Sequence, residues 1–210
     1  MRDIPVFHTA YGIASLGLKE IPYFHTAYIT VQSALDEGKL LDECVDFCRA
    51  AGAEKVYATG LTSAPCHRID VIKMMRDINV QEESAAMLFP VQDETIDKWR
   101  DIYNRKMCNV TGAAYMTYIM AKGILADRKA YFVHTEGELI GIGTACGDTI
   151  SAVASIKRGA GKDVVTALFG GLAENTAVIE VASDNAKAVA LYESLGFVST
   201  GIARTWYKIF

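Results

Sequence analysis

Ser151-Ala-Val-Ala-Ser-Ile-Lys-Arg-Gly-Ala-Gly-Lys-Asp163 is the stretch of sequence that decides the fold. Its first half is apolar and predicts a strand, and its second half is a basic, glycine-containing loop that opens a helix. Glycines let a backbone approach a phosphate closely, and the free N–H groups and dipole of a helix start attract negative charge. Arg158 and Lys162 add two full positive charges. The stretch therefore predicts an anion-binding site.

Two familiar phosphate motifs do not account for this loop. A Walker loop needs a glycine where the chain has Ile156 and a serine or threonine where it has Asp163. Gly141-x-Gly143 approaches the dinucleotide fingerprint, but Cys146 holds the place of the third glycine and no helix is predicted to follow. The anion is therefore not predicted to belong to either of these ligand classes.

A second motif follows after one predicted strand, about 25 residues further on. It is Asn185-Ala-Lys-Ala-Val-Ala-Leu-Tyr-Glu-Ser-Leu-Gly-Phe197, and its apolar residues recur at helical spacing until Gly196 ends the helix. Taken alone, this is an amphipathic helix whose Leu191, Tyr192 and Leu195 belong to a core.

The two motifs in this order resemble the GNAT acyltransferases, which move an acetyl group from acetyl-CoA to an amine. Arg158-Gly159-Ala160-Gly161 is similar to the first part of that family's pyrophosphate loop, Arg/Gln-x-x-Gly-x-Gly/Ala. Asn185-x-x-Ala188-x-x-Leu191-Tyr192-x-x-Leu195-Gly196-Phe197 is similar to its C-terminal motif. The resemblance covers about residues 84–210. It implies a GNAT fold and an N-acetyltransferase that uses acetyl-CoA as cosubstrate in a ternary complex with the amine.

The resemblance also implies a role for each matching residue. Tyr192 would protonate the departing thiolate, and Asn185 would hydrogen-bond the pantetheine arm. The backbone near Val153 and Ala154 would pair with that arm like an added strand, and the basic loop would hold the pyrophosphate. The residues expected to bind the cofactor are Val153, Ala154, Arg158, Gly159, Gly161, Lys162, Asp163 and Asn185.

Asp163 departs from the family pattern, which has glycine or alanine at this position. A carboxylate beside a pyrophosphate would cost on the order of 1–4 kcal/mol if unscreened. This motivates a second interpretation, a non-catalytic acyl-CoA-binding or protein-interaction module on the same fold. The general base is not apparent from the sequence, and Glu180 and His134 are the two candidates.

The chain as a whole predicts a mixed α/β sheet (α+β) with helices on its faces. Residues 84–210 give the order β-α-α-β-β-β-α-β-α-β. The segments are strand 84–91, helices 95–107 and 109–122, strands 130–135, 138–146 and 149–156, helix 161–174, strand 177–182, helix 184–195 and strand 198–210.

Residues 1–80 form a separate region of unknown role. Residues 1–60 predict β-β-α-β, with a helix at 33–51 and a strand at 54–59, and a further helix is predicted at 68–77. This region is either a degenerate half-copy of the same fold or an unrelated cap.

An internal repeat marks the start of the chain. Ile4-Pro-Val-Phe-His-Thr-Ala-Tyr11 recurs as Ile21-Pro-Tyr-Phe-His-Thr-Ala-Tyr28, with seven of eight positions identical. We expect two similar strand-and-turn segments. The alternative pairs His8 and His25 as ligands or as an acid and base, although no third group accompanies them.

Composition bounds the remaining expectations. The chain has 210 residues, of which 51% are hydrophobic and 22% charged, and a net charge of −4. It is therefore globular, and its acidic balance favours a small amine over nucleic acid as the partner. We expect a small-molecule amine rather than a protein amine, with a protein N-terminus or lysine as the alternative. No uncharged stretch reaches the roughly 18–20 residues that span a membrane, and no signal peptide is recognised, so we expect a cytoplasmic protein. Five scattered cysteines predict buried free thiols and no metal site, and the fold is compatible with a homodimer.

Overall fold

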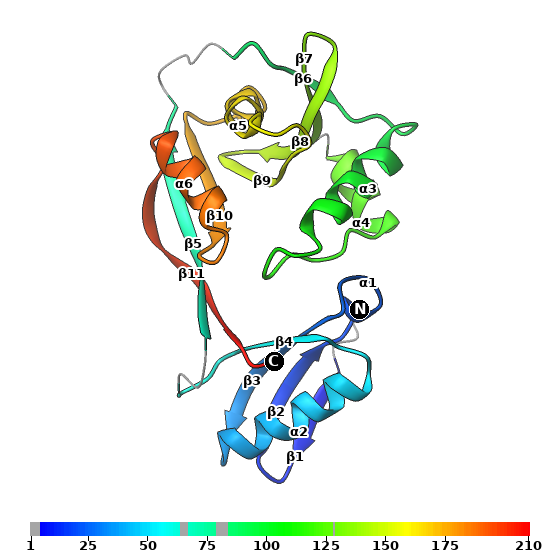
Figure 1. Ribbon diagram of the computed structural model, residues 1–210, viewed down its shortest axis with the longest axis vertical. Helices are drawn as coiled ribbons and strands as arrows, with labels where there is room; N and C mark the ends of the chain where they lie inside the picture. The colour runs from blue at the N-terminus through cyan, green and yellow to red at the C-terminus, as the bar shows by residue number, and fades with distance from the viewer. Residues whose placement is uncertain (1–4, 64–66, 79–83, 128) are drawn as a thin grey trace. The chain divides into compact units, whose positions relative to one another are not determined.

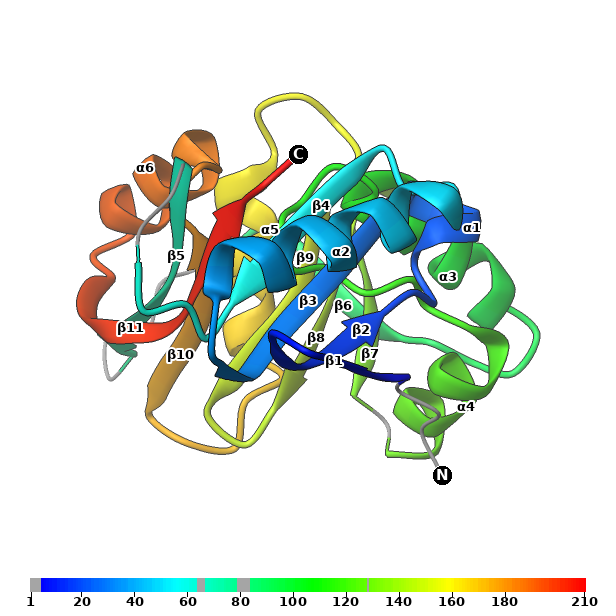
Figure 2. The ribbon, with the colours of Figure 1, turned by 90° about the horizontal axis from the view of Figure 1, so that it is seen from below.

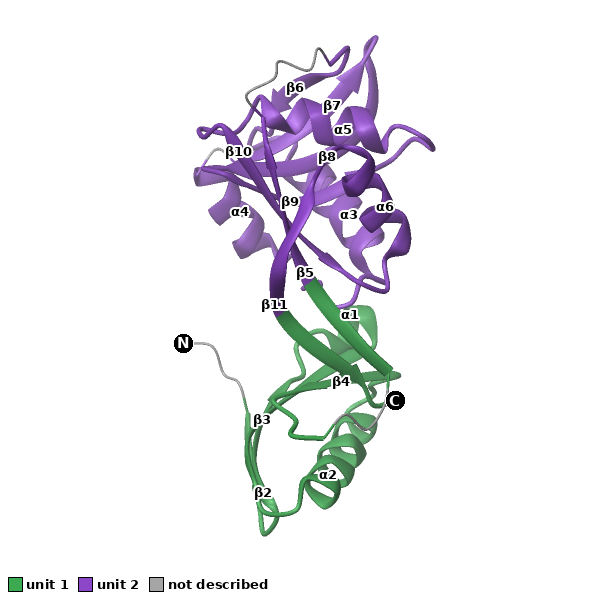
Figure 3. Ribbon diagram, turned by 90° about the vertical axis from the view of Figure 1, so that its left-hand side faces the viewer, with its two compact units in different colours: residues 1–71, 204–210 green, residues 72–203 purple. Residues whose placement is uncertain are grey.

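The computed structural model describes residues 5–63, 67–78, 84–127 and 129–210 (Figure 1). The chain is a mixed α/β protein, as the sequence predicts. It divides into two compact units (Figure 3): unit 1 holds Met1–Val71 and Arg204–Phe210, and unit 2 holds Ile72–Ala203. The boundary predicted at residues 81–83 lies outside the described residues.

Unit 2 contains the predicted succession of helices and strands. It comprises β6 (Met87–Pro90), α3 (Ile96–Met107), α4 (Tyr118–Ala126), β7 (Ala130–Thr135), β8 (Glu138–Cys146), β9 (Thr149–Ser155), α5 (Gly161–Phe169), β10 (Thr176–Ala182), α6 (Ala186–Ser194) and the first part of β11 (Val198–Lys208). The predicted element order is confirmed. The helix predicted at 109–122 begins later, at Tyr118, because the Thr117 side chain caps it by accepting the Met120 N–H.

The sheet of unit 2 places β9 between an antiparallel and a parallel neighbour. Its strand order is β11-β5-β10-β9-β8-β7-β6, in which β5 is the strand His67–Asp77. From β6 to β9 each strand is antiparallel to its neighbour in the sheet. Strands β9 and β10 are parallel and are connected through α5. Three residues of α5, Val164, Val165 and Leu168, are fully buried in the core of this unit.

The segment predicted as a helix at 68–77 is instead β5 (His67–Asp77), so this prediction is wrong. Strand β5 lies between β10 and β11 in the sheet. Along its second half, exposed Lys73 and Met75 alternate with more buried Ile72 and Met74, which is the period of a strand. Pairing on both edges outweighs the weak local preference of the segment.

Unit 1 is a smaller sheet covered by one long helix. Its elements are β1 (Val6–Thr9), β2 (Gly12–Gly17), α1 (Ile21–Phe24), β3 (Thr26–Ala34), α2 (Glu37–Ala50) and β4 (Lys55–Thr59), joined by the end of β11. The strand order is β1-β2-β3-β4-β11, and α2 packs on β2 and β3 (Figure 2). The predicted β-β-α-β order omits one strand, β2, and the short helix α1. Helix α2 starts at Glu37 rather than near residue 33 because the Asp36 side chain caps it.

The two copies of the repeat adopt different structures, which contradicts the expectation of similar segments. The first copy supplies β1, with His8 exposed in a strand. The second begins with helix α1, and His25 ends that helix in the left-handed conformation with φ of 53°. Ile4 lies outside the described residues. Local sequence is a weak prior, and the different neighbours of the two copies decide their structures.

Two expectations about the remaining chain can be compared with the described residues. Cys44 and Cys48 are buried on α2, and burial raises the pKa of both thiols to about 11. Cys108 is half-buried and Cys146 is exposed, contrary to expectation, while Cys66 lies outside the described residues. Within the described ranges no helix has the length and apolar character to cross a membrane, and no three His, Cys, Asp or Glu residues are grouped to hold a metal ion.

Candidate functional site

The parallel strands β9 and β10 are paired at one position and then separate. The two strands are in register only at Thr149 and Val178, where the Val178 N–H donates to the Asp148 carbonyl at 2.7 Å. Beyond that point the strands run in different directions (Figure 1), and no further pair joins them within the described residues. The edge of β9 that faces β10 is therefore left without a strand partner.

The backbone of β9 is organised by its other neighbour, β8. Ala154 is opposite Ile142, and the Ile156 N–H donates to the Ile140 carbonyl at 2.8 Å. Because successive residues of a strand turn their backbone groups to opposite edges, those of Val153 and Ser155 point away from β8. The sequence predicts that the backbone groups of Val153 and Ala154 pair with the pantetheine arm. The register leaves the backbone groups of Val153 and Ser155 free for such pairing, whereas those of Ala154 face β8.

A bulge interrupts β9 immediately before these residues. The register shifts between the pairs Ile142–Ala154 and Thr144–Ser151, and Ala152 has φ of 53°. A side chain at positive φ strains the backbone, and such strain tends to concentrate at functional sites. The sequence gives no signal for this feature because alanine does not favour the left-handed region.

The basic loop after β9 leads directly into an uncapped helix. Gly159 has φ of 87°, and Ala160, the N-cap of α5, offers no side-chain acceptor. The first N–H groups of α5 have no acceptor within the helix and are available to an anion. Arg158 and Lys162 are exposed and make no ion pair within the described residues, whereas Lys157 pairs with Glu138.

Asp163 lies in a pocket of about 210 Å³ beside this loop. The lining consists of Thr135, Glu136, Glu138, Ile140, Lys157, Arg158, Gly159, Ala160 and Asp163. It therefore contains three carboxylates and two cations, and one of those cations, Lys157, is already paired with Glu138. Because Glu138 is paired with Lys157, the charge conflict expected from Asp163 is increased by one further carboxylate, that of Glu136.

Gly161 joins the two sequence motifs. A Cβ atom at this position would lie 3.0 Å from Leu191 Cδ2, so the start of α5 packs closely against α6 and a larger residue would displace the Leu191 side chain. Helix α6 in turn carries Asn185 at its N-cap and Tyr192 within it. The loop and the C-terminal motif, which are separated in sequence by β10, are thus neighbours in space.

Tyr192 has a buried ring and an accessible hydroxyl. Its ring is 7% exposed and packs against Phe197, with 5.8 Å between ring centroids. Burial raises the pKa of the phenol to about 12, so the hydroxyl stays protonated at neutral pH. Among the described residues the hydroxyl has no hydrogen-bond partner, and it is not one of the fully buried polar atoms. The group can therefore donate a proton to a ligand.

Asn185 has a structural task in this fold. Its Oδ1 accepts the Ala188 N–H at 3.3 Å and so caps α6, which leaves the side-chain NH₂ group as the part available to a ligand. The residue lines a pocket of about 340 Å³ together with Lys106, Asn109, Val110 and Asp184.

Neither candidate base is joined to this pocket. Glu180 is exposed on β10 and lines none of the pockets described above. His134 lies on β7 between the rings of Phe89 and Phe132, and burial, with a smaller contribution from Lys98, lowers its pKa. Its environment is that of a packed histidine, and both residues remain candidates without geometric support.

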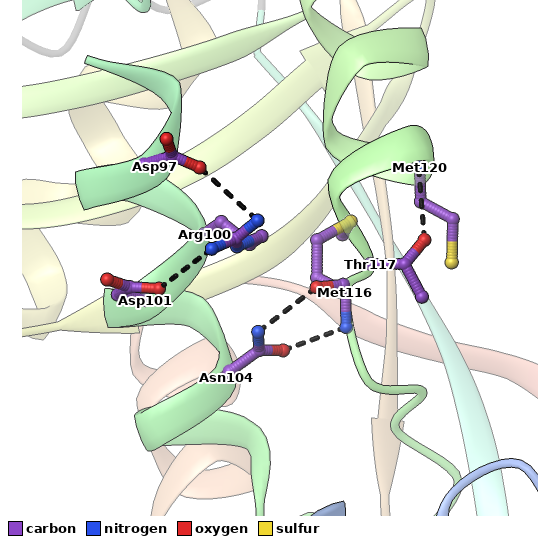
Figure 4. Close-up of polar contacts among 7 residues, drawn as sticks. All are labelled: Asp97, Arg100, Asp101, Asn104, Met116, Thr117 and Met120. Atoms are coloured by element: carbon purple, nitrogen blue, oxygen red, sulfur yellow. Dashed lines mark hydrogen bonds and ion pairs between the residues drawn. The ribbon is translucent and has the colours of Figure 1, made fainter.

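Polar contacts join helix α3 to the segment that precedes α4 (Figure 4). The Asn104 side chain accepts the Met116 N–H at 2.8 Å and donates to the Met116 carbonyl at 3.1 Å. Arg100 forms ion pairs with Asp97 and Asp101 on its own helix. The chain between the two helices is therefore anchored near its C-terminal end, whereas Asn109 and Val110 near its N-terminal end line the pocket that contains Asn185.

Comparison with solved structures identifies the fold. A functionally unknown conserved protein from Staphylococcus epidermidis ATCC 12228 aligns over 98% of this chain and 93% of its own, with a TM-score of 0.55 and 8% identity. A GCN5-related N-acetyltransferase from Sphaerobacter thermophilus aligns over 93% and 75%, with a TM-score of 0.53 and 9% identity. A GNAT-family acetyltransferase from Colwellia psychrerythraea aligns over 97% and 84%, with a TM-score of 0.51 and 13% identity.

The chain has the GNAT acetyltransferase fold. No family model matches the sequence, and no curated protein matches it by sequence. The alignment with the Colwellia structure covers 97% of the chain and so includes residues of both units. The GNAT fold inferred from the two motifs in unit 2 is thus confirmed, although the motifs alone gave no indication that the alignment extends into residues 1–80.

Proposed function

We propose that this chain is an N-acetyltransferase that transfers the acetyl group of acetyl-CoA directly to a small-molecule amine. One observation carries the proposal: within a GNAT fold, β9 and β10 separate beside a basic loop and an uncapped helix start. An extended ligand with an anionic end fits this arrangement, because the free edge of β9 can pair with it and the loop can hold its phosphates.

In the proposed reaction, different residues of the chain bind the thioester and supply the proton. The substrate supplies a thioester whose carbonyl carbon is open to attack by an amine. Backbone N–H groups on the free edge of β9, near Val153, would donate to the carbonyl oxygen as negative charge develops on it. As the new C–N bond forms and the C–S bond breaks, Tyr192 would give its proton to the sulfur, and the proton of the amine would leave to solvent.

A second function, binding of acyl-CoA without catalysis, is favoured by a specific observation. The pocket beside the loop contains Glu136, Glu138 and Asp163, and these carboxylates oppose a pyrophosphate. Under this alternative the Tyr192 hydroxyl has no chemical role.

The test is the release of free CoA thiol from acetyl-CoA in the presence of a panel of small amines. We expect Tyr192→Phe to lower kcat about 100-fold, the usual scale for a general acid, while the affinity for acetyl-CoA is retained. Tyr11→Phe, in unit 1, is the matched control and should leave kcat unchanged. Thiol release that is equal in the wild type and in Tyr192→Phe, or no release with any amine despite binding, would favour the non-catalytic module.

A further inference from the structure

The pocket beside Asn185 has a composition that none of the proposed roles explains. Its lining contains one carboxylate, Asp184, one ammonium group, Lys106, and the side-chain amides of Asn109 and Asn185. Only Val110 is apolar, and the volume is about 340 Å³. A pocket of this size with one fixed charge of each sign suits a small, doubly charged ligand.

Asp184 is held in place by a buried hydroxyl. Thr111, which is 8% exposed and lies between α3 and α4, donates to Asp184 Oδ2 at 2.7 Å. No hydrogen bond or ion pair engages Asp184 Oδ1 among the described residues, and the side chain is exposed. One carboxylate oxygen is therefore fixed by the protein while the other can accept from a ligand.

Lys106 supplies the opposite charge from the end of α3. Its side chain is exposed and forms no ion pair with any described residue. Asp184 does not neutralise it, since no bridge within 4 Å joins the two groups. The pocket thus presents a cation and an anion that are both available to a ligand.

We propose that this pocket binds the acceptor of the reaction, and that the acceptor is a zwitterion of the amino-acid type. Its ammonium group is bound by Asp184 and its carboxylate by Lys106. The proposal rests on the proposed acetyl transfer, because Asn185 places the pocket next to the groups assigned to the cofactor.

The experiment measures binding and does not depend on turnover. Protein saturated with CoA is titrated by calorimetry with the standard L-amino acids, each beside the amine that lacks its α-carboxylate. We expect at least one amino acid to bind, and its carboxylate-free amine to bind about tenfold more weakly, since one charge-assisted contact is missing.

Variants distinguish the two charged groups. Lys106→Met should weaken the amino acid about tenfold and leave the amine unchanged, whereas Asp184→Asn should weaken both, because both carry the ammonium group. Lys187→Met, at an exposed position of α6 that does not line the pocket, is the matched control. Circular dichroism of each variant verifies that it is folded.

The outcomes separate this inference from the proposed function. The inference is overturned if no amino acid binds, if amines bind as tightly as amino acids, or if Lys106→Met behaves like Lys187→Met. In those cases, thiol release with a carboxylate-free amine still supports the acetyltransferase. Conversely, amino-acid binding that depends on Lys106 and Asp184 in a protein that does not bind CoA would support the pocket and contradict the proposed function.

Discussion

The same connection occurs in both units with opposite consequences. In each, an antiparallel pair is followed by a helix and a parallel strand: β2–β3–α2–β4 in unit 1 and β8–β9–α5–β10 in unit 2. Strands β3 and β4 pair along five consecutive positions, from Thr26–Lys55 to Thr30–Thr59. Strands β9 and β10 pair only at Thr149–Val178. The first arrangement is closed, and the second exposes a strand edge.

The N-termini of helices α2 and α5 also differ, because a side chain caps α2 and none caps α5. At the start of α2, the Asp36 side chain caps the helix by accepting the Lys39 N–H. The Glu37 carboxylate in the first turn accepts hydrogen bonds from the backbone N–H groups and hydroxyls of Thr62 and Ser63. At the start of α5, no side chain caps the helix, and Arg158 and Lys162 have no ion-pair partner among the described residues. The two units therefore share an order of elements, and the parallel strands pair over a longer stretch in unit 1 than in unit 2.

The largest effect is expected where α5 approaches the sheet. In the middle of β2, unit 1 buries Ala14 and Leu16, whereas the middle of β8 has Gly141 and Gly143 against α5. A Cβ at Gly141 would lie 2.4 Å from Val164 Cγ2 and 2.9 Å from the Ala154 carbonyl oxygen, which belongs to the backbone and cannot rotate away. We expect Gly141→Ala to lower the free energy of unfolding by about 1–3 kcal/mol, measured by urea denaturation.

Gly123→Ala controls for the substitution itself. No atom lies within 4 Å of the added Cβ in helix α4, so this variant should be as stable as the wild type or up to about 1 kcal/mol more stable. Equal losses in both variants would contradict the close approach of α5 to β8.

A smaller effect on stability is expected from the Glu37 carboxylate, which links the start of α2 to Thr62 and Ser63. Burial opposes ionisation of Glu37, but the hydrogen bonds from Ser63 and Thr62 outweigh it and lower its pKa to about 2. Glu37→Gln should therefore lower the free energy of unfolding by about 1–2 kcal/mol at pH 7, because the side chain is partly exposed.

The pH dependence of that loss has a defined sign. A carboxyl group with a lowered pKa stabilises the folded state above its unfolded pKa, near 4.5, and this contribution disappears as the pH falls through about 2. The difference between wild type and Glu37→Gln should thus shrink between pH 4.5 and pH 2. Glu43→Gln, on the exposed face of the same helix, should show no such difference at any pH. If the stability lost in Glu37→Gln does not depend on pH, the negative charge of Glu37 is not what stabilises the contact with Thr62 and Ser63.

The smallest effect concerns the bulge in the open strand. Ala152 has positive φ, whereas β3 in unit 1 has no such residue along its described length. Ala152→Gly should raise the free energy of unfolding by about 0.4–1 kcal/mol, because glycine adopts this conformation without strain. Ala145→Gly, in the neighbouring β8, should be destabilising. If Ala152→Gly is as destabilising as its control, the positive φ is not a source of strain.

Local signals in the sequence predicted unit 2 well and unit 1 poorly. The loop around Gly159 and the helix stop at Gly196 depend on glycines with positive φ, which mark the turns wherever the chain folds. The structures of residues 67–77 and of the repeat depend on neighbouring strands that are distant in sequence, and there the predictions were wrong.

The candidate site shows the same limit. Arg158, Asn185 and Tyr192 could be named because their spacing resembles a family pattern. The bulge at Ala152 has no signal in an alanine, and the Thr111–Asp184 hydrogen bond joins two segments that no periodicity connects. Contacts of this kind follow from the folded sheet and not from local sequence.

Calorimetric titration of acetyl-CoA into the full chain tests the central claim most directly. The account predicts one site per chain, and about tenfold tighter binding by Asp163→Asn, because one negative charge beside the pyrophosphate is removed. Asp46→Asn, on the exposed face of α2, should bind like the wild type. Absence of binding by both the wild type and Asp163→Asn, or two sites per chain, would contradict the claim that unit 2 alone carries an open acyl-CoA site.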